Sequence, residues 1–435
     1  MIVALGGFLL GFDSAVISGA VPFIKSYFLL NEIQLGWSVS CLILGAMLGN
    51  SVAGPLSDRY GRKNVLIVTS LLFAVSAVSS ALATQFGFFI VARIVGGIGV
   101  GGAILIAPIY IAEMAPAEKR GQLVSFNQLN IVLGISAAYF SNYFLLEIGD
   151  NNWRWMLGVE AIPAIIYFSA LFIVPRSPRW LYSHGNKLQA RIILEKIGGA
   201  AYAKTCLAEI QESFDKQTTK ASLNQVFKRK YGFILLIGLT IAFFQQITGI
   251  NAVMYYAPTI FEQAGGGTKA AFMQAVVVGL TNLVFTLIAI NLIDRLGRKS
   301  LLMVGAAGMT VALSVLGFSF NKPIEDINTV IVLISVLFYV ASFAISFGPV
   351  MWVLLSEIFP NMIRGFAISI VGFFNSLVSF SVTLVFPWEL THVWPSGTFF
   401  IFGGMAFLGL LFAMFLVPET KGKSLEQIEK ELIRK

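Results

Sequence analysis

The sequence predicts an all-α membrane protein with twelve transmembrane helices, arranged as two six-helix halves that a cytoplasmic helical linker connects. Three observations support this fold class: a low content of charge, a series of long apolar stretches, and motifs that recur about 240 residues apart. The chain is 57% apolar and only 12% charged, whereas about 25% of residues are charged in soluble domains. A soluble protein of 435 residues could not cover its surface with so few charges. Lipid is therefore the expected solvent for much of this surface.

The predicted transmembrane helices follow from the apolar stretches, because a helix needs about 20 predominantly apolar residues to span a bilayer. Twelve stretches meet this requirement. The first six cover residues 1–24, 35–56, 64–84, 87–113, 122–145 and 155–174. The second six cover residues 231–261, 270–293, 300–320, 329–357, 365–388 and 397–417.

One long polar segment separates the two sets of spans. Apolar residues such as Leu188, Ile192 and Ile197 recur in it at near-helical spacing, which predicts short amphipathic helices. The predicted domains are an N-terminal six-helix half (1–174), a cytoplasmic helical linker (175–230), a C-terminal six-helix half (231–417) and a cytoplasmic tail (418–435).

The distribution of Lys and Arg predicts the orientation in the membrane. Of the 30 basic residues, 25 fall on the side that holds the linker and the tail, and cytoplasmic loops carry such an excess. Both termini are therefore expected in the cytoplasm of a multi-pass plasma-membrane protein. The apolar run at Met1 has no basic leader, so no cleavable signal is expected. The net charge of +8 does not indicate nucleic acid, because its basic residues form no aromatic-interleaved patch.

Short motifs occur twice along the chain. Asp58-Arg-Tyr-Gly-Arg-Lys63 returns as Asp294-Arg-Leu-Gly-Arg-Lys299, and Glu113 with its following Arg-Gly returns as Glu357. Pro175-Arg-Ser-Pro returns in the same register as Pro418-Glu-Thr-Lys. A common period indicates two halves in parallel repeat, which predicts a substrate site near the midplane, where the repeats meet.

Together these motifs closely resemble those of the sugar porter family of the major facilitator superfamily, bacterial proton–xylose and proton–glucose symporters in particular. Gln245-Gln-Ile-Thr-Gly-Ile-Asn251 and Pro418-Glu-Thr-Lys-Gly422 belong to the same set, which spans the whole chain. The resemblance implies the major facilitator fold and import of a hexose or pentose with a proton by alternating access. A sugar, a proton and the lipid bilayer are the expected partners, and we expect a monomer. One motif departs from the family pattern, since Arg176 stands where an acidic residue is usual.

The identity of the sugar stays open at this stage. Ser376 follows Asn375 where the resembled glucose and xylose carriers have Trp, and Leu10 and Ile135 replace an aromatic residue and an amide. Such changes alter the shape of a pocket and are compatible with fructose, another sugar or a polyol.

Among the charged residues within predicted spans, Asp13 lies in the middle of the first and Arg93 lies in the fourth. Charges at membrane depth are costly and persist when they are paired or line a polar pathway. A static ion pair that only joins two helices is one interpretation. The other is a proton site, which the resemblance favours because proton-coupled members carry Asp at the position of Asp13. Asp13 is expected to be the only carboxylate near the midplane.

Uncharged polar residues in the spans are the candidate sugar ligands. Amide groups offer both donors and acceptors, which suits a ligand rich in hydroxyl groups, although isolated amides in membranes also join helices. The candidates are Gln128, Gln245, Gln246, Asn251, Tyr255, Asn282, Trp352 and Asn375. A straight helix would point Gln246 about 140° away from Asn251 at 100° per residue. We therefore expect a break at Gly249, and a similar hinge near Gly348-Pro349.

The repeated charged motifs are predicted to form a cytoplasmic latch that closes the inner side in the outward-open state. Its expected residues are Asp58, Arg59, Arg62, Glu113 and Arg120 in the first half, with Asp294, Arg295, Arg298, Glu357 and Arg364 in the second.

The sequence contains no pattern typical of an enzyme, a cofactor site or a metal site. Gly97, Gly99 and Gly101 lie inside a predicted span with no preceding strand, so close helix packing explains them better than a dinucleotide loop. His184 and His392 are isolated. Two alternatives to symport remain: a proton-independent uniporter and a sugar sensor without transport, which the short tail from Pro418 disfavours.

Overall fold

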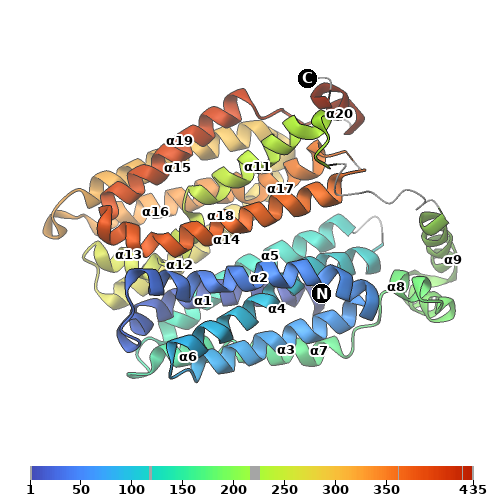
Figure 1. Ribbon diagram of the computed structural model, residues 1–435, viewed down its shortest axis with the longest axis horizontal. Helices are drawn as coiled ribbons and strands as arrows, with labels where there is room; N and C mark the ends of the chain where they lie inside the picture. Colours follow the sequence, from blue (N-terminus) through green and yellow to red (C-terminus); the bar gives the residue numbers. More distant parts are fainter. Residues whose placement is uncertain (1, 117–119, 216–225, 361, 424, 434–435) are drawn as a thin grey trace. The chain divides into compact units, whose positions relative to one another are not determined.

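The computed structural model describes residues 2–116, 120–215, 226–360, 362–423 and 425–433. Within these residues all regular structure is helical (Figure 1). Eleven helices of this part of the chain are long and apolar enough to cross a membrane. The predicted all-α membrane fold is confirmed.

The helices of the first half match the six predicted spans. The fifth span is α5, which is 26 residues long, and the sixth is divided into α6 and α7. The bounds are η1 (Ile2–Ala4), α1 (Leu5–Tyr27), α2 (Glu32–Tyr60), α3 (Arg62–Ala81), α4 (Phe86–Met114), α5 (Arg120–Leu145), α6 (Asn152–Gly158) and α7 (Ala161–Leu171).

The second half matches its six spans in the same order, with two of them broken. The seventh span consists of α11, α12 and α13, and the tenth of α16 and α17. The bounds are α11 (Gly232–Ile247), α12 (Ile250–Tyr255), α13 (Ala257–Gln263), α14 (Thr268–Leu296), α15 (Arg298–Phe320), η4 (Ile324–Asp326), α16 (Thr329–Ala344), α17 (Phe347–Ile358), α18 (Arg364–His392) and α19 (Trp394–Phe415).

Both predicted breaks occur, one of them slightly displaced. Gly249 has φ 85°, a left-handed conformation that separates α11 from α12. The tenth span breaks at Ser346, just before Gly348-Pro349. Pro349 lies in the first turn of α17, where a missing N–H removes no helical hydrogen bond.

The linker is helical, as predicted, with residues 216–225 outside the described part of the chain. It contains α8 (Pro178–Ser183), α9 (Lys187–Asp215) with a kink at Gly199, and η3 (Arg229–Tyr231). The tail adds α20 (Leu425–Ile433), which the sequence analysis did not predict.

The chain forms two compact units that do not coincide with the two repeats. The first consists of Met1–Ser14, Cys41–Ala138 and Arg154–Lys220, and the second of Ala15–Ser40, Tyr139–Trp153 and Ala221–Lys435. Four helices of the first repeat, α1, α2, α5 and α6, therefore contribute one end to each unit. The domain boundaries expected from the repeat stay a prediction.

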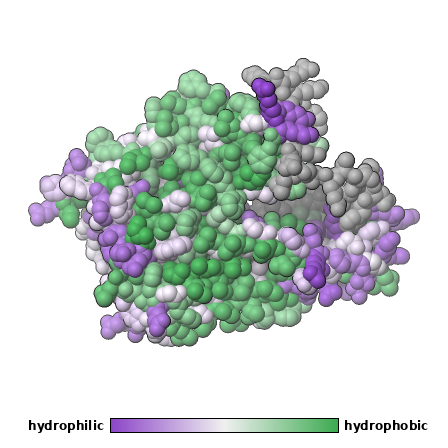
Figure 2. Space-filling view, in the orientation of Figure 1, coloured by the Kyte–Doolittle hydropathy of each residue, from purple (hydrophilic) through white to green (hydrophobic). Residues whose placement is uncertain are grey.

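Small residues let helices of the first unit approach closely. A Cβ atom added to Gly97 or Gly101 of α4 would collide with backbone carbonyl oxygens of α2, those of Leu42 and Ala46. The Gly97–Gly101 motif therefore packs helices together, as predicted. On the face shown in Figure 2, hydrophobic side chains cover the middle of the helices and hydrophilic ones gather near their ends. Such a band is expected of a surface that meets lipid.

Candidate functional site

The two charged residues predicted to meet in the membrane form a buried ion pair. Asp13 of α1 and Arg93 of α4 are each 1% exposed. Arg93 Nη1 donates to Asp13 Oδ1, and Arg93 Nη2 donates to the Asp13 backbone carbonyl at 3.3 Å. Burying two charges costs several kcal/mol per ion before their attraction offsets it. The desolvation cost of this pair indicates that the pair serves a function or that further interactions offset the cost.

A second carboxylate lies at this ion pair, and the sequence analysis missed it. Glu160 precedes the first residue of α7, is 2% exposed, and interacts electrostatically with both Asp13 and Arg93. Because Glu160 lies at the same ion pair, the expectation that Asp13 is the only carboxylate near the midplane was wrong. The signal was present in the sequence, because Glu160 falls inside the predicted span 155–174, as Asp13 falls inside the first.

These three residues, which we call the acid cluster, carry one more acid than base. With both carboxylates ionised the cluster holds a net charge of −1 in a region that disfavours charge, and one added proton makes it neutral. Asp13 Oδ2 and Glu160 Oε1 are buried and accept no hydrogen bond from an N–H or O–H donor among the described residues, and the two carboxyl groups lie within hydrogen-bonding reach of each other. Each of these oxygens is a place where the added proton can reside.

The amide side chains of the second unit form a connected cluster. Asn375 Nδ2 donates to Gln245 Oε1 at 2.7 Å, and Gln246 Nε2 donates to Asn375 Oδ1 at 3.2 Å. Asn251 Nδ2 donates to Gln246 Oε1 at 2.9 Å and to Ser379 Oγ at 2.7 Å. Four predicted ligands from α11, α12 and α18 thus meet in what we call the amide cluster. Ser379 was missed, although it lies one helical turn after Asn375.

The break at Gly249 makes this cluster possible. In a straight helix Gln246 and Asn251 would point in different directions, whereas here their side chains form a hydrogen bond across the break. A further bond, from Gln245 Nε2 to the Phe347 carbonyl at 2.9 Å, ties the cluster to the start of α17, at the other broken span. Both discontinuities therefore lie beside the polar side chains, as do the broken helices that line binding sites in transporters.

The remaining predicted ligands lie outside these hydrogen bonds. Tyr255 and Asn282 are half-buried, and Trp352 is exposed. Gln128 is exposed on α5 and belongs to the first compact unit. Their participation in the sugar site stays a prediction.

The two charged motifs form corresponding hydrogen bonds in the two halves of the chain. In the first half Arg62 Nε donates to Glu113 Oε1 at 3.1 Å, and Arg62 Nη1 donates to Asp58 Oδ1 at 2.7 Å. Ser177 Oγ donates to Glu113 Oε2 at 2.5 Å.

The second half reproduces this pattern at the corresponding positions. Arg298 Nη2 donates to Glu357 Oε1 at 2.8 Å, and Thr420 Oγ1 donates to Glu357 Oε2 at 2.5 Å. The predicted repeat is thus present in detailed geometry. Among the described residues, each set of ion pairs forms within its own repeat. The role of these residues as a latch stays a prediction.

Other predicted latch residues make different contacts. Arg59 lies over the Tyr60 ring at 5.2 Å, and Arg364 Nε donates to the Phe359 carbonyl at 3.0 Å. The Arg295 backbone carbonyl accepts from Lys421 Nζ at 2.5 Å. The side chains of Arg120 and Asp294 lie outside the described set.

Arg176 breaks the symmetry between the halves. At the matching position of the second half, Glu419 accepts backbone N–H bonds from Arg298 at 3.1 Å and Lys299 at 3.2 Å, at the first turn of α15. A carboxylate at a helix N-terminus satisfies free N–H groups and complements the helix dipole. At α3 the corresponding side chain is a cation, which lies over the Trp180 ring at 5.8 Å.

We expect Arg176→Glu to raise the free energy of unfolding by about 1 kcal/mol, the usual effect of a favourable charged group at a helix N-terminus. Unfolding in detergent, followed by intrinsic fluorescence, measures the change. Arg176→Gln is the matched control, because it removes the cation without adding a carboxylate. A Glu variant no more stable than the Gln variant would contradict this interpretation of α3.

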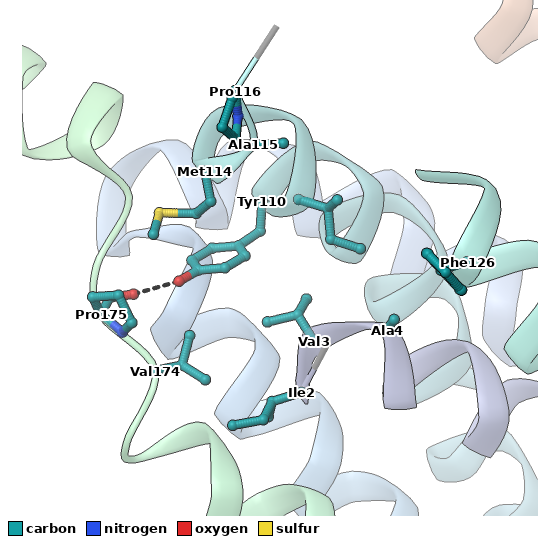
Figure 3. A pocket seen from close by; sticks show the side chains of 11 residues that line it. Ile2, Val3, Ala4, Tyr110, Met114, Ala115, Pro116, Phe126, Val174 and Pro175 are labelled. Atoms are coloured by element: carbon teal, nitrogen blue, oxygen red, sulfur yellow. Dashed lines mark hydrogen bonds between the residues drawn. The ribbon is translucent and has the colours of Figure 1, made fainter. Parts of the chain in front are cut away.

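A cavity of about 480 Å³ in the first unit does not fit a sugar (Figure 3). Its lining is almost entirely apolar and includes Ile2, Val3, Met114 and Val174. The hydroxyl of Tyr110 at its wall already donates to the Pro175 carbonyl at 2.7 Å. A ligand rich in hydroxyl groups would lose its hydrogen bonds to water there without replacing them.

Comparison with known proteins agrees with these features. The model of the family "Sugar (and other) transporter" matches residues 1–432. The chain is 40% identical to the D-xylose-proton symporter of Escherichia coli (strain K12), over 99% of this chain and 94% of that protein. It is also 40% identical to the arabinose-proton symporter of Bacillus subtilis (strain 168), over 99% of this chain and 93% of that protein.

Solved structures extend the similarity to the fold. The inward-open form of the E. coli xylose transporter XylE matches with a TM-score of 0.88 and 38% identity, covering 99% of this chain and 98% of that one. XylE bound to 6-bromo-6-deoxy-D-glucose matches with a TM-score of 0.79 and 39% identity at the same coverage. The chain belongs to the sugar transporter family of the major facilitator superfamily.

Proposed function

We propose that this protein is a monosaccharide:proton symporter that imports a hexose or pentose by alternating access. The acid cluster of Asp13, Arg93 and Glu160 is the observation that carries the proposal, because a passive sugar carrier has no need for three buried ionisable groups. The relatives at 40% identity, which are named as proton symporters of xylose and arabinose, support the same function.

The acid cluster supplies the proton step. One proton on Asp13 or Glu160 neutralises the cluster. On Asp13 it weakens the ion pair with Arg93, whereas on Glu160 it removes the carboxylate that competes with Asp13 for Arg93. The two protonation states therefore differ in how strongly α1, α4 and α7 are held together. A transport cycle needs such a difference, since only differential contacts shift a conformational equilibrium.

The amide cluster supplies the sugar step. In the absence of sugar its amides hydrogen-bond one another. A sugar hydroxyl is both a donor and an acceptor, so it can take the place of one amide in such a bond without leaving the other amide unpaired. The discontinuous helices α11–α12 and α16–α17 allow the local backbone to move while the cluster stays connected.

The excess of Lys and Arg on one side supports an orientation with both termini and the linker in the cytoplasm. The relatives from bacteria support a plasma-membrane location. We infer that one chain is the functional unit, because the acid cluster and the amide cluster are each assembled from a single chain.

Replacing Gln245 or Asn251 by Ala is expected to weaken sugar binding by about tenfold or more, since an unpaired buried polar group costs about 1–3 kcal/mol. Isothermal titration calorimetry in detergent measures this effect. Asn142→Ala is the matched control: Asn142 is buried, as Gln245 is, but its Nδ2 donates to the Val16 carbonyl at 3.1 Å, outside the amide cluster. It should lower folded yield more than affinity. Unchanged affinity in both test variants would mean that the amides only join helices.

The proposal is tested by uptake of radiolabelled pentoses, hexoses and polyols into proteoliposomes. Symport predicts that at least one monosaccharide accumulates above its external concentration under an inward proton gradient, and that a protonophore abolishes the accumulation. Equilibration without accumulation would indicate a uniporter. Binding without any flux would indicate a sensor.

The panel must be broad because the side chain at position 376 is small. Ser376 is half-buried and its Oγ donates to the Gly372 carbonyl at 3.1 Å. A serine that bonds to its own helix leaves more room than an indole ring.

A further inference from the structure

The seventh span has two discontinuities, and each leaves a backbone carbonyl without its helical donor. Thr248 follows the last residue of α11 and directly precedes the left-handed residue Gly249. Met254 lies in the last turn of α12, and the residue four positions later is Pro258, which has no N–H. Buried carbonyls in membrane proteins need a substitute donor.

A tyrosine hydroxyl serves as that donor at each end of α12. Tyr339 Oη donates to the Thr248 carbonyl at 2.8 Å, and Tyr139 Oη donates to the Met254 carbonyl at 2.6 Å. Tyr339 is fully buried and Tyr139 is 1% exposed. The six-residue helix α12 is thus fixed between two equivalent side-chain bonds.

The two tyrosines come from different repeats. Tyr339 lies on α16, in the same repeat as α12, whereas Tyr139 lies on α5 of the first repeat. The second compact unit joins residues 139–153 to the C-terminal helices. It also holds the ring contact of Trp37 with Phe380 at 5.5 Å. In the proposed orientation, the end of the second unit that contains residues 139–153 and Trp37 faces the outside of the cell.

We propose that the hydroxyl of Tyr139 is a latch for the outward-closed state, which holds α12 against the first repeat. The proposal rests on the proposed transport function, in which the repeats separate on the outer side to admit sugar. That movement breaks the bond between Tyr139 and Met254, which joins the repeats. It leaves the bond between Tyr339 and Thr248 intact, because both residues belong to one repeat.

This asymmetry predicts different effects for the same chemical change. In the outward-closed state, Tyr139→Phe leaves the Met254 carbonyl buried without a donor, whereas in the outward-open state water can reach it. The variant therefore destabilises only the closed state and shifts the equilibrium toward outward-open by about tenfold. Tyr339→Phe removes an equivalent bond from both states, so it lowers stability without a comparable shift.

Double electron–electron resonance between spin labels at Leu29 and Ile324 measures the opening. Both residues belong to the second unit and are exposed, 88% and 67%; Leu29 lies in the turn after α1, and Ile324 begins the short helix η4. The two cysteines, Cys41 and Cys206, are first replaced by Ser. The full-length protein is measured in lipid nanodiscs without sugar or a proton gradient, so the result does not depend on which substrate is carried.

The expected result is a larger long-distance population in Tyr139→Phe than in the parent protein, with Tyr339→Phe like the parent. Tyr139→Leu, which also lacks the hydroxyl, repeats the test if the Phe variant gives too little folded protein. An unchanged distribution in the Tyr139 variants, or the same shift in Tyr339→Phe, would overturn the latch. Either result would leave the proposed symport intact, because sugar accumulation is assayed separately.

Discussion

Replacing Asp13 by Asn is expected to abolish accumulation of sugar against its gradient while exchange of sugar across the membrane continues. Asparagine keeps the shape of the side chain but carries no exchangeable charge, so the acid cluster loses the carboxylate that pairs with Arg93. A proton that enters with the sugar gains about 2.3 kcal/mol per 100 mV, enough for a gradient of several tens-fold. That gain requires a titrating group on the transport path.

Accumulation is measured in vesicles with an imposed pH gradient, and counterflow is measured in the same preparation. Asp150→Asn, in an exposed loop, is the matched control and should accumulate sugar normally. Glu160→Gln tests the second carboxylate in the same way. If Asp13→Asn vesicles still concentrate sugar, Asp13 is not the proton carrier, and loss in Glu160→Gln alone would assign that role to Glu160.

Replacing Gly249 by Val is expected to remove sugar binding and to lower the folded yield severely. The left-handed backbone at Gly249 costs roughly 1–2 kcal/mol for any residue with a Cβ, and more for a β-branched one. An added Cβ would also collide with the Phe402 ring. That ring stacks on Phe386 with an interplanar angle of 11°, so it has little room to move. Overpacking of this kind adds about 1–3 kcal/mol.

Fluorescence-detected gel filtration and sugar titration measure the two effects of Gly249→Val separately. Gly404→Ala on α19 is the matched control, because an added Cβ there meets no atom within 4 Å. A Gly249→Val protein that folds and binds sugar like the parent would show that the break does not build the amide cluster.

The sequence was sufficient for most of the fold because each feature had a strong local signal. Apolar length predicted the spans, and the recurrence of Glu113 as Glu357 predicted the repeat. The break at Gly249 followed from the conflict between helical geometry and the positions of Gln246 and Asn251. The pairing of Asp13 with Arg93 followed from the cost of isolated charge in a membrane.

What the sequence did not reveal depends on contacts between distant segments. Glu160 carried a signal, but only the packing of α7 shows that it shares Arg93 with Asp13. No pattern distinguishes Tyr139 and Tyr339 from other buried tyrosines, since their partners are backbone carbonyls freed by breaks elsewhere in the chain. The tenth span breaks at Ser346 and not at Pro349, because proline is accommodated in the first turn of the helix that begins after the break.

The most direct test of proton coupling is the lumenal pH of proteoliposomes when sugar is added outside. The vesicles contain a trapped pH dye, begin with equal pH on both sides, and are held at zero potential with potassium and valinomycin. Symport predicts that a transported monosaccharide acidifies the lumen, that a non-transported sugar does not, and that Asp13→Asn vesicles show no acidification. Entry of labelled sugar into wild-type vesicles at constant lumenal pH would contradict the account and identify the protein as a uniporter.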